Sequence, residues 1–242
     1  MKNISTSDQL KNNYADYYES GDSEWRRLGA VDKTANIVDL CNDLPHAAIL
    51  EIGAGEGSIL KRMSELGFGE KLYALEISQS GVDTIKSRDI PQLTECLLFN
   101  GYDLPYEDHK FDLAILSHVI EHVEYPRKLL YEAARAARYV FVEVPLEDNL
   151  RLKRDFVPDK VGHINFYSPI TIRRLIQTCG MQVLKQTVTN PSKAVHKYRV
   201  GRKGVINYYI KEYLLKFLPG VATKFFNYHS SLVFQVNRST LR

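Results

Sequence analysis

The stretch AAILEIGAGEGS, residues 47–58, decides the fold. It opens with a continuous and mostly apolar run, which is typical of a parallel strand covered on both faces. The run passes directly into a turn that contains Gly53, Gly55 and Gly57, and a helical pattern over residues 57–66 follows. Glycines permit a tight turn and let a ligand approach the backbone, while the start of a helix offers free N–H groups. The stretch therefore predicts a strand, a turn and a helix that together bind a nucleotide-like ligand.

Two carboxylates indicate which ligand it is. Glu76 ends the next apolar run, 21 residues after Gly55, where a carboxylate can accept both hydroxyls of a ribose. Glu51 lies inside the first run and places a negative charge where a dinucleotide would need its pyrophosphate. The third glycine also comes one position too early for a GxGxxG fingerprint. An acidic, glycine-lined site instead favours a cation without phosphate, and S-adenosylmethionine carries an ammonium and a sulfonium.

Strand and helix patterns alternate outward from this stretch. Short apolar runs predict strands, and stretches with a 3.6-residue period predict helices between them. We expect a Rossmann-like α/β fold, with a mostly parallel seven-stranded sheet and helices on both faces. The predicted strands are 47–52, 72–77, 95–99, 111–117, 139–144, 181–189 and 231–236, and the predicted core helices are 57–66, 79–87, 126–137 and 168–179.

Further motifs extend the pattern into a family resemblance. The run NGYDLPY at 100–106 is followed by FDLA at 111–114 and by HVIEHV at 118–123. Together with E-x-G-x-G-x-G and Glu76, these motifs resemble the class I S-adenosylmethionine-dependent methyltransferases over roughly residues 47–190. The similarity is closest to the small-molecule branch that includes the ubiquinone-biosynthesis O-methyltransferases.

The resemblance implies a set of cofactor contacts. Gly53, Gly55 and Gly57 would shape the turn, with Glu51 beside it, and Glu76 would hold the ribose. The other implied contacts are Ile77 on the adenine, Asn100 and Gly101 near the adenine amino group, and the Ser117 carbonyl at the methionine ammonium. Asn100 stands where the family usually has Asp, and an isolated Asn of this kind is otherwise a turn residue. Arg26 and Arg27 either clamp the cofactor carboxylate or form a solvated pair.

Methyl transfer to a hydroxyl requires a base beside the acceptor. Three histidines follow strands at the edge where open α/β sheets bind ligands, namely His118, His122 and His163. We predict His163 as the base, with a loop-tethering role as the alternative, and His118 as a second catalytic candidate. His118 and His122 are expected to share a helical face with Glu121. HVIEH is not the HExxH zinc signature, so no metal is predicted.

Two segments decorate the single domain expected over residues 1–242. Residues 1–43 form an N-terminal helical cap, with Tyr14, Tyr17, Tyr18 and Trp25 as an amphipathic cluster or a lid. Residues 44–190 form the cofactor-binding core, 191–230 a basic, aromatic, helical insertion, and 231–242 the last strand and tail. Within the insertion, residues 193–224 carry eight Lys and Arg side chains against the single acid Glu212. The insertion is interpreted as a lid, a membrane or dimer contact, a phosphate-binding patch, or a helix with solvated lysines.

Composition narrows the class of protein. The 242 residues are 44% hydrophobic and 25% charged, which excludes disordered, collagen-like and coiled-coil chains. The three cysteines form no CxxC pair, and MKNISTSDQL lacks the features of a signal peptide, so we expect a cytoplasmic protein with reduced thiols. The motif for methylating base nitrogens is missing after residues 111–117, and no cysteine lies between Cys96 and Cys179 to attack a cytosine ring, which argues against nucleic acid as the acceptor.

The sequence therefore predicts a monomeric or homodimeric enzyme that transfers a methyl group from S-adenosylmethionine to an oxygen atom of a small molecule. A lipid-linked acceptor with peripheral membrane contact is one form of this prediction. The alternatives are an NAD(P)-dependent oxidoreductase, which the early Gly57 and Glu51 disfavour, and a noncatalytic S-adenosylmethionine-binding protein.

Overall fold

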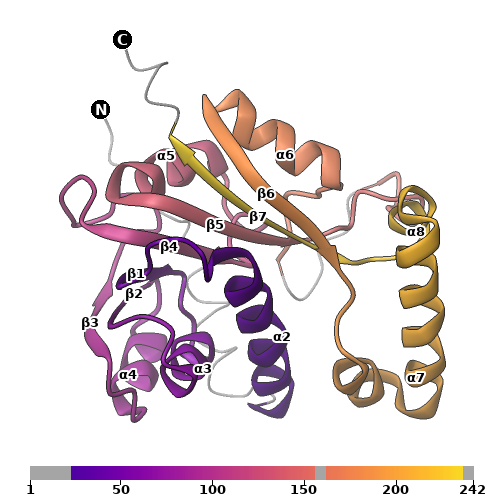
Figure 1. Cartoon of the computed structure of the whole chain (residues 1–242), viewed down its shortest axis with the longest axis horizontal. Helices are drawn as coiled ribbons and strands as arrows, with labels where there is room; N and C mark the ends of the chain where they lie inside the picture. The colour runs from indigo at the N-terminus through magenta and orange to yellow at the C-terminus, as the bar shows by residue number, and fades with distance from the viewer. Residues whose placement is uncertain (1–22, 156–161, 237–242) are drawn as a thin grey trace.

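A seven-stranded sheet forms the centre of the computed structural model, which describes residues 23–155 and 162–236 (Figure 1). The strand order is β3-β2-β1-β4-β5-β7-β6, with β1 to β5 parallel and β7 antiparallel to both of its neighbours. The predicted mostly parallel α/β sheet is confirmed. The strands are β1 (Ala48–Ile52), β2 (Lys71–Glu76), β3 (Leu93–Leu98), β4 (Phe111–Ser117), β5 (Ala137–Pro145), β6 (Met181–Thr189) and β7 (His229–Val236).

Helices cover both faces because successive side chains of a strand point to opposite sides. In β4, Leu113 and Ile115 belong to one hydrophobic cluster, while Ala114 and Leu116 belong to the other. The first cluster is completed by α2 (Ser23–Cys41), α3 (Ser58–Leu66) and α4 (Gln79–Ser87), and the second by α5 (Pro126–Ala136) and α6 (Pro169–Thr178).

Local signals explain where the core helices begin and end. Ser168 caps α6 in a reciprocal capping box with Thr171. Gly67 ends α3 with φ +65°, in the left-handed conformation that glycine adopts without strain. The predicted bounds of these helices therefore agree with the observed ones to within about a residue.

The insertion between β6 and β7 consists of α7 (Lys193–Phe217) and α8 (Pro219–Phe225). These helices pack against each other at one side of the sheet, and α7 also contacts α2 (Figure 1). The backbone of α7 is kinked at Gly201, whose φ of 62° and ψ of −142° are not helical.

The part of the N-terminal segment that can be described is α2, which packs on α3, α7 and β7. Tyr14, Tyr17 and Tyr18 lie outside the described residues. Trp25 faces Tyr198 of α7 with 6.3 Å between the ring centroids. Within residues 23–155 and 162–236, no helix is both long and apolar enough to cross a membrane.

Candidate functional site

The glycine turn joins β1 to α3 at the carboxyl edge of the sheet. The backbone N–H groups of Gly53 and Ala54 both donate to the carbonyl of Leu75, at 2.8 and 3.0 Å, which fixes the turn against the end of β2. Gly53 has φ +72°, and a Cβ there would lie 2.8 Å from Cγ2 of Val119. A side chain at this position would therefore cause both backbone strain and a clash with Val119. Only glycine fits here, so the turn presents backbone atoms rather than a side chain.

Glu76 is held against this turn. Its Oε2 accepts a hydrogen bond from the N–H of Gly55 at 2.8 Å, and its Oε1 accepts from the N–H and hydroxyl of Ser78, each at 3.1 Å. The residue is only 2% exposed, and burial raises its pKa although these donors oppose the shift. The structure thus brings together the acid and the turn that sequence analysis paired.

Glu51 is a buried carboxylate close to the same turn. It is 2% exposed, and its Oε2 has no hydrogen-bond partner among the described residues. Burial raises the pKa of Glu51 to about 8; Lys33 opposes this shift and the nearby Glu76 adds to it. A buried carboxylate without a full set of partners is costly in its ionised form, so this position favours a cationic ligand.

Glu56 connects the turn to α2 and to the end of α4. Its carboxylate lies 2.8 Å from Nε of Arg26 and 3.1 Å from Nη2 of Arg88. Arg27, by contrast, pairs with Glu24 on the surface of α2. Of the two arginines considered for a cofactor carboxylate, only Arg26 lies beside the turn.

Asn100 organises the loop after β3. Its Oδ1 accepts hydrogen bonds from the N–H groups of Tyr102 and Asp103, at 2.9 and 2.8 Å. Gly101, which directly follows Asn100, has φ +92°. The oxygen expected to meet an adenine therefore already serves a turn of the loop. Ile77 is half-buried and packs on the core beside the end of β2.

The segment after β4 differs from its prediction. The N–H of His118 donates to the carbonyl of Glu143 at 2.9 Å, which extends the pairing of β4 with β5. His118 then takes φ +57°, and the chain turns until α5 begins at Pro126. The expectation that His118 and His122 share a helical face with Glu121 was wrong because strand pairing continues through His118 and a tight turn follows.

His118 and the preceding Ser117 lie at the end of β4, and Ser117 is 7% exposed. The imidazole of His118 stands between two fully buried carboxylates: Nδ1 is 3.3 Å from Oε1 of Glu121, and Nε2 is 3.3 Å from Oε1 of Glu143. His229 faces the same carboxylate, with Nδ1 3.8 Å from Oε1 of Glu143. Burial alone would lower the pKa of His118, but the two carboxylates raise it overall.

Sequence analysis missed Glu143 and His229. Glu143 was the one carboxylate inside the apolar run YVFVEV, and an acid in such a run signals a buried polar partner. His229 opens β7, two residues before the predicted start of that strand. Its placement beside Glu143 follows from the antiparallel register, in which Pro145 pairs with His229.

His163 reaches the same edge from the loop after β5. Its Nδ1 is 2.7 Å from Oε2 of Glu147, and its ring lies 4.7 Å from that of His122. The loop is tied to the turn after β4, since Asn165 donates its side-chain amide to the carbonyls of Ile120 and Val123 at 3.1 and 2.7 Å. The structure therefore groups His118, His122 and His163 as expected and adds Glu147 as the partner of His163.

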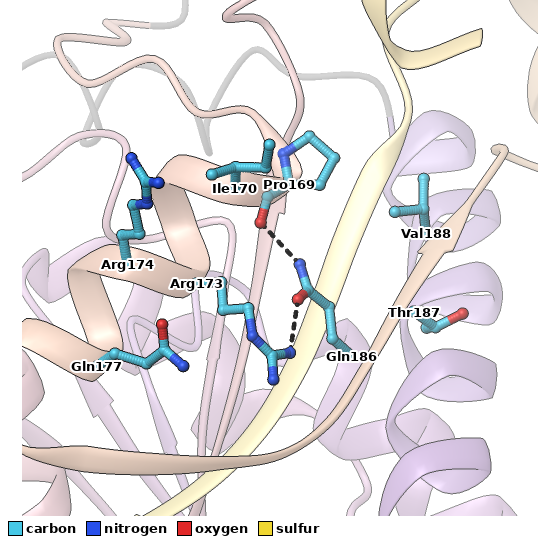
Figure 2. A pocket seen from close by; sticks show the side chains of 8 residues that line it. All are labelled: Pro169, Ile170, Arg173, Arg174, Gln177, Gln186, Thr187 and Val188. Atoms are coloured by element: carbon cyan, nitrogen blue, oxygen red, sulfur yellow. Dashed lines mark hydrogen bonds between the residues drawn. The ribbon is translucent and has the colours of Figure 1, made fainter. Parts of the chain in front are cut away.

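A separate cleft of about 440 Å³ lies between α6 and β6 (Figure 2). Gln186 spans it, donating to the carbonyl of Pro169 at 2.9 Å and accepting from Arg173 at 3.1 Å. Its lining residues belong neither to the glycine turn nor to the histidine and glutamate groups. We therefore do not include this cleft in the candidate site at the glycine turn.

Known proteins match both the sequence and the fold. The sequence model of a family described as "Methyltransferase domain" matches residues 24–186. An uncharacterised protein of Methanocaldococcus jannaschii is 28% identical over 188 residues, 73% of this chain and 85% of that protein. The mitochondrial ubiquinone biosynthesis O-methyltransferase of Candida albicans is 23% identical over 182 residues, 70% of this chain and 53% of that enzyme, so the match spans about half of that relative.

A solved structure shows the same fold over nearly the whole chain. The S-adenosylmethionine-dependent methyltransferase of Thiobacillus denitrificans, in complex with S-adenosylhomocysteine, superposes with a TM-score of 0.56 at 12% identity. The superposition covers 96% of this chain and 100% of that one.

Proposed function

The chain belongs to the Methyltransferase domain family and is a class I S-adenosylmethionine-dependent methyltransferase, and from this premise we propose that it methylates an oxygen atom of a small molecule with His163 as general base. The cofactor excludes the alternative of an NAD(P)-dependent oxidoreductase. The acceptor, the atom methylated and the role of each side chain belong to the proposal.

The residues at the glycine turn fit this cofactor. Glu51 and Glu76 are two buried carboxylates at the turn, and one oxygen of Glu51 has no hydrogen-bond partner among the described residues. A ligand that carries an ammonium and a sulfonium favours the ionised form of both buried carboxylates, whereas a pyrophosphate would oppose it. We assign the cofactor to Glu51, Gly53, Gly55, Gly57, Glu76, Ile77, Gly101 and Ser117, and we assign Asn100 to the same site as the residue that shapes the loop beside the adenine, since its Oδ1 is engaged by Tyr102 and Asp103.

The pair formed by His163 and Glu147 carries the proposal for the base. When bound, S-adenosylmethionine supplies a methyl group on a positively charged sulfur. The Glu147 carboxylate, 2.7 Å from Nδ1 of His163, accepts a hydrogen bond from the N–H at that nitrogen, which leaves the basic lone pair on Nε2. Nε2 then takes the hydroxyl proton of the acceptor, and Glu147 stabilises the resulting imidazolium.

His118 is the second catalytic group of the proposal. It directly follows Ser117 at the end of β4, and its imidazole is fixed between Glu121 and Glu143. Burial and these contacts hold its ring at the carboxyl edge of the sheet. From there it faces the acceptor rather than the cofactor turn.

The surface of α7 favours a peripheral membrane contact, with a lipid-linked acceptor, as the role of the insertion. It favours the alternative role of a lid less. Five large side chains follow one another at helical spacing, and each is about half exposed or more: Ile206, Tyr209, Ile210, Tyr213 and Phe217. Arg202, Lys203 and Lys216 flank this stripe, as in helices that lie on anionic bilayers. Lys211 does not share their exposure, because its Nζ donates to the carbonyl of Asn227 at 2.7 Å and the residue is 6% exposed.

We keep the single-domain division of the chain into a cap (1–43), a core (44–190), an insertion (191–230) and a last strand with tail (231–242). A monomer or homodimer in the cytoplasm completes the proposal.

One experiment tests the function. The enzyme, methyl-labelled S-adenosylmethionine and a metabolite extract are mixed, and mass spectrometry identifies compounds that gain one labelled methyl group. A hydroxyl compound that gains the label with the wild-type protein and not with His163→Ala supports the proposal. Labelling at nitrogen or carbon only, or unchanged turnover in His163→Ala, contradicts it.

A further inference from the structure

We propose that His118, Glu143 and His229 bind a divalent transition-metal ion at the carboxyl ends of β4 and β5 and the start of β7. The binding of the metal stands on the geometry alone. Its role toward the acceptor rests on the proposed function.

The three side chains present their ligand atoms to a common point. Each offers one atom, and these atoms all lie within 4.8 Å of one another. Oε1 of Glu143 is 3.3 Å from Nε2 of His118 and 3.8 Å from Nδ1 of His229. Ligands at about 2.0–2.2 Å from a tetrahedral zinc ion are separated by about 3.3–3.6 Å, so the 3.3 Å separation agrees with a shared ion and the 3.8 Å separation lies just above that range.

Hydrogen bonding does not account for the arrangement. Nε2 of His118 and Oε1 of Glu143 are both buried and close together, yet neither has a hydrogen-bond partner among the described residues. Their separation permits a hydrogen bond, so their directions prevent it. A metal ion between two buried polar atoms that lie this close without bonding each other would satisfy both of them.

Neighbouring groups hold Glu143 and His118 in place. The other oxygen of Glu143 accepts hydrogen bonds from Nδ2 of Asn36 and from the hydroxyl of Ser231, each at 2.7 Å. Nδ1 of His118 is 3.3 Å from Oε1 of Glu121. A carboxylate behind a ligating histidine, and hydrogen bonds behind a ligating carboxylate, are the usual surroundings of protein metal sites.

The donor set indicates the class of metal and its use. Two imidazoles and one carboxylate suit zinc and related divalent transition metals. Three protein ligands leave a coordination position for water or for an oxygen of the acceptor, as in catalytic rather than structural sites. A metal bound there would polarise the acceptor hydroxyl, whose proton the proposed function gives to His163.

A second group, Glu121, His122 and His163, also has ligand atoms close together. In this group Nε2 of His122 lies 4.0 Å from Oε1 of Glu121, farther apart than the corresponding atoms of the first group, and His163 is the general base of the proposed function. The inference therefore concerns the first group only.

Zinc binding to the full chain tests the site. The protein is stripped with a chelator and dialysed against micromolar Zn²⁺, and metal content is measured by mass spectrometry. Visible absorption after loading with Co²⁺ reports the coordination. We expect one equivalent of zinc in the wild-type protein, binding at least about 100-fold weaker in His118→Ala and His229→Ala, and about 10- to 100-fold weaker in Glu121→Gln.

His46→Ala is the matched control. His46 is also packed in the fold, stacked on Phe68 with 4.2 Å between ring centroids, but it precedes β1 at the opposite edge of the sheet. Its loss should leave zinc binding unchanged. Circular dichroism and thermal melts confirm that each variant folds, and His229→Asn replaces His229→Ala if the latter does not.

No retention of zinc by the wild-type protein, or equal retention by His118→Ala and His229→Ala, overturns the site. Binding of S-adenosylhomocysteine to the metal-free protein is measured by calorimetry in parallel. If that binding persists while zinc does not bind, the metal site fails and the methyltransferase proposal stands. If zinc binds and labelled methyl reaches no hydroxyl compound, the site stands and the proposed function fails.

Discussion

The carboxylate of Glu76 accepts a hydrogen bond from the backbone N–H of Gly55, with 2.8 Å between Oε2 and the nitrogen. The bond joins the end of β2 to the turn after β1, two neighbouring parallel strands. One side chain thus shapes the turn and presents its remaining lone pairs at the same place. The cofactor site proposed here depends on this pair.

Glu76→Ala should weaken the binding of S-adenosylhomocysteine about 10- to 100-fold, because hydrogen bonds to a charged group are each worth about 1.5–3 kcal/mol. Isothermal titration calorimetry measures the change. Glu70→Ala, which removes an exposed carboxylate just before β2, is the control and should bind as the wild type does. If the wild type, Glu76→Ala and Glu70→Ala bind S-adenosylhomocysteine equally well, Glu76 does not contact the cofactor.

Glu51 predicts a pH dependence of folding stability. Its pKa is about 8 in the folded protein, chiefly through burial, whereas an unfolded chain gives about 4.3. Between these values the folded state keeps a proton that the unfolded state has lost, so this group's contribution to stability falls as pH rises from about 4.5 to 8. Glu51→Gln should resemble the wild type near pH 5 and exceed its free energy of unfolding by about 1–3 kcal/mol at pH 8.

Urea denaturation without cofactor at several pH values measures this difference. Glu70→Gln, at an exposed position, should show none of it. A Glu51→Gln protein whose stability relative to wild type does not change with pH would show that Glu51 is ionised throughout.

His163→Asn should lower kcat by about 10²- to 10⁴-fold, the usual contribution of a general base. Glu147→Gln should lower kcat by a smaller factor and leave KM for the cofactor unchanged, because the neutral amide still orients Nδ1 but stabilises the imidazolium less. Glu147→Asp should restore part of the loss. Steady-state kinetics on the identified acceptor measure each value.

Asp148→Asn is the control for Glu147, since it neutralises the adjacent and exposed carboxylate. If Glu147→Gln and Asp148→Asn behave alike, Glu147 does not position His163.

The stripe on α7 predicts binding to anionic vesicles. Basic residues near such a surface contribute about 1 kcal/mol each, so the combined variant Arg202→Glu, Lys203→Glu and Lys216→Glu should sediment at least about tenfold less with phosphatidylglycerol vesicles. Lys211 is left in place because its charge reversal would break a buried contact.

Reversal of Lys71, Lys86 and Arg138, which are exposed elsewhere on the fold, changes the net charge equally and is the control. Equal sedimentation of the two variants would argue against a membrane contact through α7. Light scattering that shows a dimer disrupted by Tyr213→Ser would assign the stripe to a second copy of the chain.

Local sequence was enough to predict the first half of the site. The turn after β1 needs glycine at Gly53 because of its positive φ and the nearby Val119, and that need is visible as a motif. The approach of Glu76 to Gly55 follows from two consecutive parallel strands that end at one edge. Both relationships involve elements that are consecutive in the chain, so they could be predicted from the periodicity and spacing of the sequence.

The second half of the site, which contains the histidines and glutamates, depended on strand and loop contacts that cannot be read from a local sequence pattern. His229 meets Glu143 and His118 only because β7 runs antiparallel to β5 in a register that places His229 opposite Pro145. The contact of Glu147 with His163 likewise depends on a loop tied to the turn after β4.

The α/β class, the succession of strands and helices in the cofactor half and the acidic glycine turn were thus readable from the sequence, because short-range periodicity and conformational preference encode them. Only the tertiary structure decided which buried histidines and glutamates meet at the acceptor side. That choice is made by strand register and loop closure, which arise from the packing of the whole chain.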